Sequence, residues 1–269
     1  MKIPVLTAFL LLNIFVFSLV TAPAEEEKAI SEKNEYGGKT VATTYTANDE
    51  QYGNLEKSIS YLDGDRKMVK IEHYYKDKYV KNQGYYKVAT YFDSSGKMTR
   101  IEYSFTDEYI REKGLDRRTA YFDSDERLAR EERFYTAKFA VAQGYDRKIA
   151  YFDGNEKVAR IEYLFTDTSV DKRGYFKIVS YFDSEEKPAR EERFYTAKFV
   201  GEQGYDRKIT YFDSDEKPAR IEYFYTKLFA HENGFDRAMA YLDNNGQLTK
   251  VEYYLNGKTI QVKQQEFRS

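Results

Sequence analysis

The chain has 269 residues, with 43 lysines and arginines, 45 aspartates and glutamates and a formal net charge of −2. Charges of alternating sign argue against a nucleic-acid partner, because phosphate binding needs a clustered basic surface. The absence of cysteine excludes disulfides, thiol nucleophiles and thiolate metal ligands. Aromatic residues make up 17% of the chain, so rings must supply much of the core of a β-rich fold.

Residues 1–24 have the pattern of a secretory signal peptide. Lys2 precedes an apolar run from Ile3 to Val20, and Ala22-Pro23-Ala24 supplies the small residues of a cleavage site before Glu25. The run is short for a membrane span, which needs about 20 residues. We therefore expect a mature chain that starts at Glu25, has no stable membrane span, and is secreted or located in the periplasm or cell envelope.

Residues 25–38 are polar and acidic, a composition that predicts a disordered spacer. The next stretch, Lys39 to Thr46, aligns with the second half of a later unit, with Tyr45-Thr46 matching Phe165-Thr166. Because the ends of repeat arrays carry atypical units, we expect this half-unit to cap the array.

A tyrosine-x-aspartate triplet then recurs every 30 residues without insertion or deletion. It opens at Tyr61, Tyr91, Tyr121, Tyr151, Tyr181, Tyr211 and Tyr241. Constant spacing is the signature of units that stack on a shared core, since a change of length would break their register. The repeat domain therefore spans residues 39–258, as a half-unit cap plus seven units, and residues 259–269 form a C-terminal tail.

Each unit predicts a β-hairpin followed by a short helix. In a central unit, Tyr145–Asp153 and Val158–Thr166 alternate as strands do, and Gly154–Lys157 has turn composition. The helix is clearest at Thr136–Gly144, where threonine is the N-cap and glycine the C-terminal stop. We predict a mainly β fold, a tandem array of seven 30-residue units forming an elongated stacked sheet or solenoid. A closed barrel is the further arrangement that the pattern leaves open.

A trial register for the hairpin places Asp153 opposite Lys157. It pairs Lys148 with Glu162 across the hairpin, an interaction worth about 0.2–1 kcal/mol. Phe152 is the one residue near the turn that fits this register poorly, since it falls on the more polar face.

One strand position provides candidate binding residues. Stacked units would alternate guanidinium groups with phenol rings there, at about 0.5–2 kcal/mol per contact. The position holds His73 in the first unit and then the candidates Tyr103, Arg133, Tyr163, Arg193, Tyr223 and Tyr253. The trial register also sets Arg133 opposite Arg117, so either Glu131 offsets the repulsion diagonally or the register is wrong.

A longer period overlies the first. Residues 130–153 and 190–213 agree at 20 of 24 positions, which indicates a duplicated 60-residue pair.

The triplet, the glycine-containing turns at Gly96 and Gly246 and the following Lys97 resemble the YD repeats of the Rhs family and, more loosely, the hairpins of MORN repeats. YD repeats are shorter and centred on Gly-Arg. The resemblance implies a stacked β-hairpin sheet on an exported protein, and no functional residue is carried over.

The sequence offers no singular reactive constellation. Glutamates and bases recur at fixed positions in all seven units, whereas catalysis needs one site in which the pKa values of two groups are driven apart. His73 and His231 are 158 positions apart, and the acidic turns such as Asp123-x-Asp125 are too short for the six to eight oxygen ligands of calcium. We therefore expect no catalysis, cofactor or metal.

These observations predict an exported, non-enzymatic repeat protein, structural or adhesive, that binds a protein or a cell-surface polysaccharide through an extended repeated face. Self-association is compatible with the same face. One alternative is a carbohydrate-binding protein that uses exposed tyrosines, for which the exposure of Tyr163 and Tyr223 is the discriminating observation. A second is an outer-membrane β-barrel, which the alternation, the tyrosines and the leader would fit.

Overall fold

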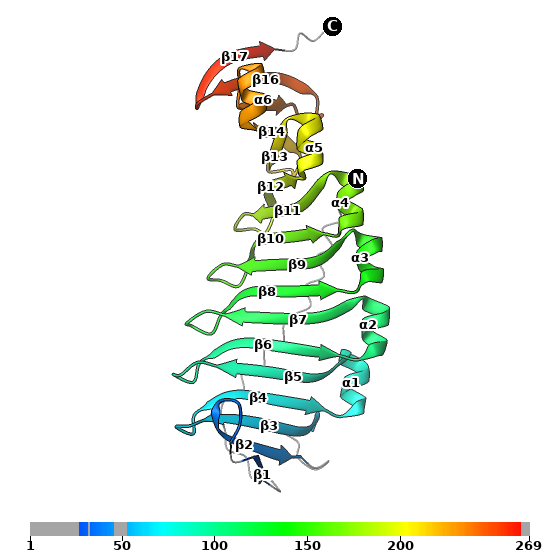
Figure 1. The fold of residues 1–269 in the computed structure, drawn as a ribbon, viewed down its shortest axis with the longest axis vertical. Helices are drawn as coiled ribbons and strands as arrows, with labels where there is room; N and C mark the ends of the chain where they lie inside the picture. The colour runs from blue at the N-terminus through cyan, green and yellow to red at the C-terminus, as the bar shows by residue number, and fades with distance from the viewer. Residues whose placement is uncertain (1–26, 32, 46–52, 265–269) are drawn as a thin grey trace.

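The computed structural model describes residues 27–31, 33–45 and 53–264, so the predicted leader lies outside the described residues. The chain forms one antiparallel sheet of 17 strands, in which each strand pairs with its neighbours in sequence. The strands lie across the long axis of an elongated ladder (Figure 1). The predicted mainly β tandem array is therefore confirmed.

The elements follow one another with the 30-residue period of the sequence. The strands are β1 (Glu27–Ser31), β2 (Gly37–Thr44), β3 (Leu55–Asp63), β4 (Met68–Tyr75), β5 (Tyr85–Phe92), β6 (Met98–Phe105), β7 (Leu115–Phe122), β8 (Leu128–Tyr135), β9 (Tyr145–Phe152), β10 (Val158–Phe165), β11 (Tyr175–Phe182), β12 (Pro188–Tyr195), β13 (Tyr205–Phe212), β14 (Pro218–Tyr225), β15 (Arg237–Leu242), β16 (Leu248–Leu255) and β17 (Lys258–Gln264). The helices are α1 (Asp77–Gln83), α2 (Asp107–Lys113), α3 (Ala137–Gln143), α4 (Asp167–Arg173), α5 (Ala197–Gln203) and α6 (Lys227–Asn233).

Both ends of the array carry strands outside the seven hairpins. Within residues 25–38, where the composition predicts a spacer, the chain forms β1 and begins β2. The half-unit strand β2 pairs with β3 on its inner side and with β1 on its outer side. Most of β17 lies within residues 259–269, where the sequence predicts a tail, and it pairs with β16. Among the described residues, no helix is both long enough and apolar enough to cross a membrane.

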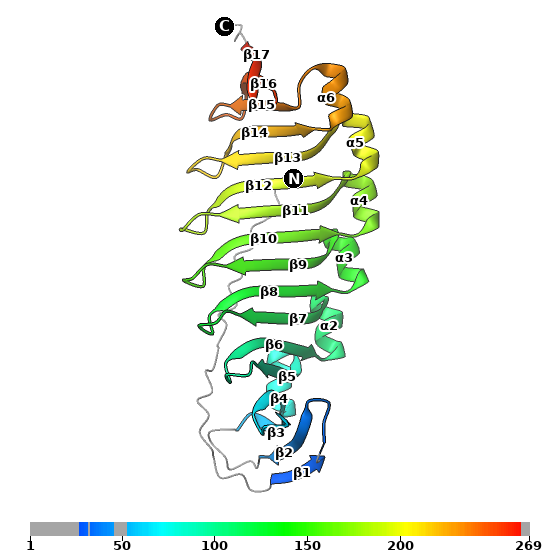
Figure 2. The same cartoon turned by 60° about the vertical axis from the view of Figure 1, so that its left-hand side comes forward.

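The helices form the second edge of the ladder, as the capping residues predict. The hydroxyl oxygen of Thr136 accepts the backbone N–H of Phe139 at the start of α3. Gly144 ends this helix in the left-handed conformation, with φ of 90°. The backbone N–H of Thr136 also donates to the carbonyl oxygen of Gly114 at 2.8 Å, which ties each helix to the preceding one. Helices α2 to α6 stack along one side of the ladder (Figure 2).

The turns at the opposite edge share one chemistry. In the turn 123–127, Oδ1 of Asp123 accepts the backbone N–H groups of Asp125 at 2.9 Å and of Arg127 at 3.0 Å. Glu126 adopts a left-handed φ of 59°. That conformation costs a non-glycine residue about 1–2 kcal/mol, so another interaction must hold it.

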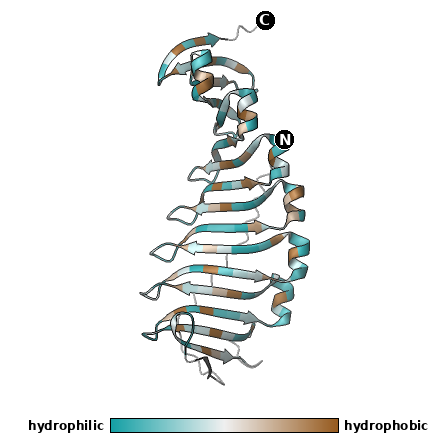
Figure 3. Ribbon diagram, viewed as in Figure 1, coloured by the Kyte–Doolittle hydropathy of each residue, from teal (hydrophilic) through white to brown (hydrophobic). Residues whose placement is uncertain are grey.

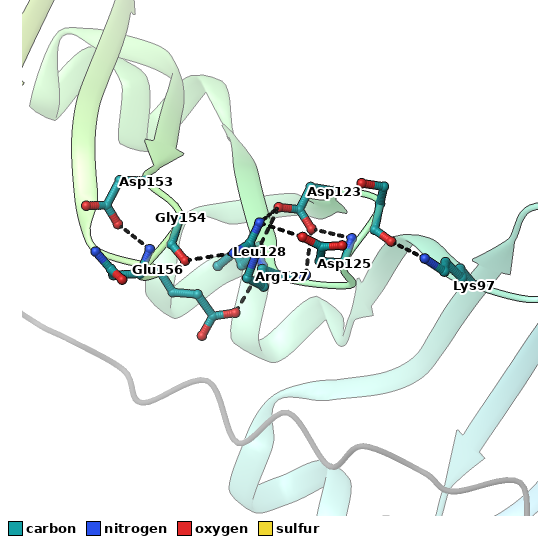
Figure 4. Close-up of polar contacts among 10 residues, drawn as sticks. Lys97, Asp123, Asp125, Arg127, Leu128, Asp153, Gly154 and Glu156 are labelled. Atoms are coloured by element: carbon teal, nitrogen blue, oxygen red, sulfur yellow. Dashed lines mark hydrogen bonds and ion pairs between the residues drawn. The ribbon is translucent and has the colours of Figure 1, made fainter.

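Contacts between successive turns provide that interaction (Figure 4). Oε1 of Glu156 accepts the backbone N–H of Leu128 in the preceding hairpin at 3.1 Å. The guanidinium of Arg127 donates in turn to the carbonyl oxygen of Gly154 at 3.4 Å. The left-handed glutamate therefore links neighbouring units.

The trial register is wrong by one residue through the middle of each hairpin. Phe152 pairs with Val158 as expected, but Tyr151 then pairs with Arg160 and Lys148 with Tyr163. The cause is a pair of bulges, at Ala159 near the turn and at Asp146 near the helix, which shift the register out and back. Lys148 therefore does not meet Glu162, as the trial register expected.

A one-residue shift exchanges the faces of a strand, so the bulges decide which side chains share a face. We call one side of the sheet the ladder face; in the central unit it carries Arg147, Ile149, Tyr151, Arg160, Glu162 and Leu164. The ring face carries Tyr145, Lys148, Ala150, Phe152, Ile161, Tyr163 and Phe165. Figure 3 shows hydrophobic and hydrophilic residues mixed along every hairpin, as expected for a sheet with two such faces.

Aromatic packing on the ring face joins the sheet to the helices. The ring of Phe139 stacks on Tyr135 with centroids 4.7 Å apart, and Tyr145 meets Tyr135 edge-on at 5.5 Å. Nearer the turns, Ala120, Phe122 and Leu128 form a buried cluster. Contacts between neighbouring strands, such as that of Tyr135 with Tyr145, recur along the sheet, so the core is a continuous row rather than a central globule.

Candidate binding face

Tyrosines and bases alternate without a break along the ladder face. Because the 17 strands pair in sequence order, each tyrosine of the triplet from Tyr91 onward has a base opposite it on both neighbouring strands, whereas Tyr61 lies between Lys70 and Thr40. In register order the residues are Tyr61, Lys70, Tyr91, Arg100, Tyr121, Arg130, Tyr151, Arg160, Tyr181, Arg190, Tyr211, Arg220, Tyr241 and Lys250. We call this row the tyrosine ladder.

The geometry of the tyrosine ladder is that of cation–π contacts. The Cζ atom of Arg160 lies 3.8 Å from the ring centroid of Tyr151, and the same separation is 4.0 Å for Arg190 and Tyr181. A lysine takes the place of arginine at Lys250. Such contacts contribute about 0.5–2 kcal/mol each, and here they fix the long basic side chains against the sheet.

A row of glutamates runs beside the tyrosine ladder and neutralises part of its charge. Oε1 of Glu132 lies 3.2 Å from Arg130 on its own strand, and Oε2 lies 2.8 Å from Arg147 on the next. The first unit repeats the pattern with lysines, since Glu72 lies 3.0 Å from Lys70 and 3.3 Å from Lys87. Glu162 and Glu192 likewise pair with two bases each.

Tyrosine hydroxyls complete the polar network. The hydroxyls of Tyr61 and Tyr74 both donate to Oε2 of Glu72, at 3.2 and 3.0 Å. Burial and the neighbouring Glu72 carboxylate raise the pKa of Tyr61 to about 12. Although burial alone would raise the pKa of Glu72, hydrogen bonds from Lys70 and Tyr74 hold it below its ordinary value. The Glu72 carboxylate is therefore held in its ionised form by its partners.

A third row, nearer the helices, again alternates bases with mostly aromatic residues. Its members in register order are Lys57, Tyr74, Lys87, Ser104, Arg117, Phe134, Arg147, Leu164, Lys177, Phe194, Arg207, Phe224, Arg237 and Tyr254. The guanidinium of Arg207 lies 4.0 Å from the ring centroid of Phe224. Ser104 and Leu164 are the two positions where no ring is present.

Charges of opposite sign alternate along the sequence, but the fold gathers an excess of bases on the ladder face and an excess of acids in the turns. The ladder face carries fourteen bases and seven glutamates in the three rows, a net charge of +7. The seven five-residue turns, from 63–67 to 243–247, carry fifteen acids and seven bases, a net charge of −8. The side chain of Arg130 is 36% exposed and that of Glu132 is 7% exposed, whereas the side chains of Arg100 and Glu102 are each 37% exposed. The ladder face is thus a repeated basic surface.

The predicted column of binding residues lies on the ring face. Guanidiniums and phenols of the column do not contact one another directly. Between each two successive members lies another strand, which contributes its own residue to the same face. Arg133 lies between Arg118 and Lys148, and Arg118, not Arg117, is the residue opposite it. Tyr163 is half-buried, 5.0 Å from the ring centroid of Tyr145. The cation–π alternation expected for this column occurs instead in the tyrosine ladder.

The other members of the column have similar surroundings. Tyr103 and Tyr223 contact the rings of Tyr85 and Tyr205, at 5.4 and 5.0 Å, and Tyr253 contacts Phe235 at 4.8 Å. Arg193 pairs with Glu191 at 2.7 Å. These residues are half-buried among rings rather than exposed in a row, and a binding role for them stays a prediction.

Comparisons with known proteins do not assign the chain to a family. No family model and no curated protein matches the chain. Matched solved structures include the crystal structure of TcdB2-TccC3 without hypervariable C-terminal region, at 9% identity and a TM-score of 0.16 over 84% of this chain and 14% of that one. The crystal structure of TcdB2-TccC3 matches at 9% identity and a TM-score of 0.14, over 86% of this chain and 17% of that one. This chain spans less than a fifth of those chains, so its function is inferred from its own residues.

Proposed function

We propose that this is an exported, non-enzymatic adhesive protein that binds an acidic polysaccharide of the cell surface along the ladder face. The observation that carries the proposal is the net charge of +7 in three rows of the ladder face that repeat over seven units. A weak contact repeated on one rigid body acts at high effective concentration, so avidity exceeds single-unit affinity by about 10²–10⁴.

Charge spacing favours a sparsely charged polymer. Each unit adds two bases and one glutamate, a net charge of +1, and advances the ladder by two strands, about 9.4–9.8 Å. Duplex DNA carries one negative charge per about 1.7 Å of its axis, which is far denser than this surface. An extended polysaccharide with one carboxylate in every two sugars has a charge spacing of the same order as the ladder.

Shape favours a flexible partner over a flat one. Neighbouring strands of a sheet rotate by about 20–25°, and the hairpins near β5 and near β13 are seen at different angles in Figures 1 and 2. The ladder face therefore winds around the long axis. A flexible chain can follow this winding surface through all seven units, whereas a rigid plane can touch only a few.

The tyrosines act differently from those of a sugar-stacking site. In the tyrosine ladder a base covers each ring, as Arg220 does on Tyr211 at 3.9 Å. This arrangement supports recognition of carboxylates by held guanidiniums more than stacking of sugar rings on open tyrosines. The tyrosines position the bases, and the bases make the contact.

Binding to hyaluronan, which carries one carboxylate per disaccharide, tests the proposal. We expect affinity to rise steeply from two to four to seven units and to fall with added salt, since each contact releases counterions. Substitution of Arg160, Arg190 and Arg220 by glutamine should weaken binding, because it removes three adjacent bases of the ladder face.

Matched controls separate this surface from overall charge. Substitution of Lys97, Lys157 and Lys217 in the turns by glutamine makes the same change in net charge on the acidic edge, and it should leave binding unchanged. Dextran, a neutral polymer, should not bind. Equal loss in both triple variants, binding independent of unit number, or tighter binding of duplex DNA than of hyaluronan would contradict the proposal. Export is tested separately, by N-terminal sequencing of secreted material, which should begin near Glu25.

A further inference from the structure

Three basic side chains lie side by side on the ring face, away from the ladder face. Arg118 of β7 is directly opposite Arg133 of β8, and Arg133 is directly opposite Lys148 of β9. Opposed residues of an antiparallel pair have Cβ atoms about 4.5–5.5 Å apart, where like charges destabilise the sheet. A row of three cations needs negative charge close by.

Glu131 supplies part of that charge. Nε and Nη2 of Arg118 donate to its Oε2 at 2.8 and 2.5 Å, and Nε of Arg133 donates to Oε1. Although burial alone would raise the pKa of Glu131, the two guanidiniums hold it below its ordinary value. One carboxylate therefore serves two arginines, and the group of four residues keeps a net charge of +2.

Lys148 is the cation left without a carboxylate. Among the described residues, Nζ of Lys148 lies 5.7 Å from the ring centroid of Tyr163, and no ion pair joins Lys148 to Glu131. Burial and the neighbouring Arg133 lower the pKa of Lys148. The positive charge of this residue is thus held in an unfavourable environment by the fold.

The two guanidiniums are more exposed than the carboxylate that pairs with them. The side chain of Glu131 is 5% exposed, whereas those of Arg118 and Arg133 are 16% and 31% exposed. The carboxylate is therefore at the base of the group and the guanidiniums are nearer its mouth. Each guanidinium carries five N–H donors in a planar fork, a geometry that suits an oxyanion.

The duplicated half of the array holds a matched group with one cation fewer. Arg193 and Lys208 are opposed on β12 and β13, and Glu191 lies 2.7 Å from Arg193. At the position equivalent to Arg118 the chain has Ile178, opposite Arg193. This second group has a net charge of +1 and a buried aliphatic side chain where the first has a third base.

We propose that Arg118, Arg133 and Lys148 form a binding site for a single oxyanion, the carboxylate or phosphate group of a small ligand or of a polymer end, on the face opposite the ladder face. The anion would take the place between Lys148 and the guanidiniums, with Glu131 orienting the two arginines from below. Its binding offsets the repulsion across β7, β8 and β9.

The test measures thermal unfolding of the full chain in chloride, phosphate and glucuronate at equal ionic strength. We expect phosphate or glucuronate to raise the melting temperature by about 2–4 °C at concentrations near ten times the dissociation constant. K148I should remove this rise and should melt higher than the parent in chloride, because it removes the cation that has no carboxylate. Isoleucine is native at the equivalent Ile178, so the variant is expected to fold.

The duplicate group provides the control. K208I changes the equivalent lysine of the group that has Ile178, and it should keep the full anion-dependent rise. Isothermal titration with phosphate and with glucuronate tells which source of oxyanion the site prefers. The proposal is overturned if neither anion shifts the melting temperature beyond chloride, or if K148I keeps the same shift as K208I. Both substitutions lie on the ring face. The outcome of the hyaluronan experiment, which tests the ladder face, is therefore independent of the outcome of this one.

Discussion

Glycines that end the helices give a quantitative test of how units stack. Gly204 and Gly234 occupy equivalent positions in neighbouring units, with left-handed φ values of 82° and 78°. A Cβ atom on Gly204 would lie 2.1 Å from Cδ2 of Phe229 in the next helix, whereas a Cβ atom on Gly234 would meet nothing within 4 Å. Alanine at the two positions therefore separates backbone strain from loss of packing.

The structure sets the size of the two effects. G234A should cost about 1–2 kcal/mol, the left-handed penalty alone. G204A should cost that amount plus about 1–3 kcal/mol for a displaced ring in a packed core. The displaced ring also loses its stacking on Tyr225, whose centroid is 4.6 Å away. Hydrogen exchange of the flanking amides, followed by mass spectrometry, measures the local opening free energy at the same end of the array.

A double-mutant cycle makes the test decisive. F229A removes the ring that the new methyl group would strike, so G204A in the F229A background should cost only the left-handed penalty. Equal costs for G204A and G234A in the parent chain would refute the reasoning. An undiminished cost of G204A beside Ala at position 229 would refute it equally.

Three further predictions concern the turns, the repeat and pH. E156G relieves left-handed backbone strain but removes the acceptor of the Leu128 N–H. Hydrogen exchange of the Leu128 amide should therefore become faster, while global stability changes by less than about 1 kcal/mol. Unchanged hydrogen exchange would contradict the link between turns. Deletion of residues 144–173 should leave a cooperative thermal transition by circular dichroism and deletion of residues 144–158 should not; equal tolerance would contradict shared register. The folded-state pKa of Tyr61 is raised from 10.0 to about 12. Its contribution to stability is therefore present below pH 10 and is lost as the pH rises towards 12. Phenolate absorbance would follow this titration, and ionisation of Tyr61 at pH 10 in the folded chain would contradict the prediction.

The elements were predictable because their signals are local. Three signals act on the backbone within a few residues: the threonine before the helix, the glycine after it, and the aspartate that accepts N–H groups of the turn. All three recur every 30 positions. The period gives the order of pairing too, since short connections make neighbouring strands pair. Thr136 and Gly144 perform the capping roles that their chemistry predicts.

The faces were not predictable, because a single unpaired residue exchanges them. The bulges at Ala159 and Asp146 leave the length of the unit unchanged and are cancelled within one hairpin. One signal was present: Phe152, on the polar face of the trial register, belongs with Val158 on the ring face once the shift is made. Without the shift the basic rows are scattered over both faces, and neither the tyrosine ladder nor the group around Glu131 can be assembled.

The orientation of the strands determines how this molecule responds to mechanical load. Strands lie across the long axis, so the backbone hydrogen bonds between them point along it (Figure 1). Tension on the two ends would therefore separate strands one pair at a time, at low force, instead of shearing many bonds together. Each 30-residue unit that opens converts about 9.4–9.8 Å of ladder into roughly 100 Å of extended chain. A protein anchored at one end and attached along its length would then lengthen under load before it detached, and would recover by re-pairing strands one unit at a time.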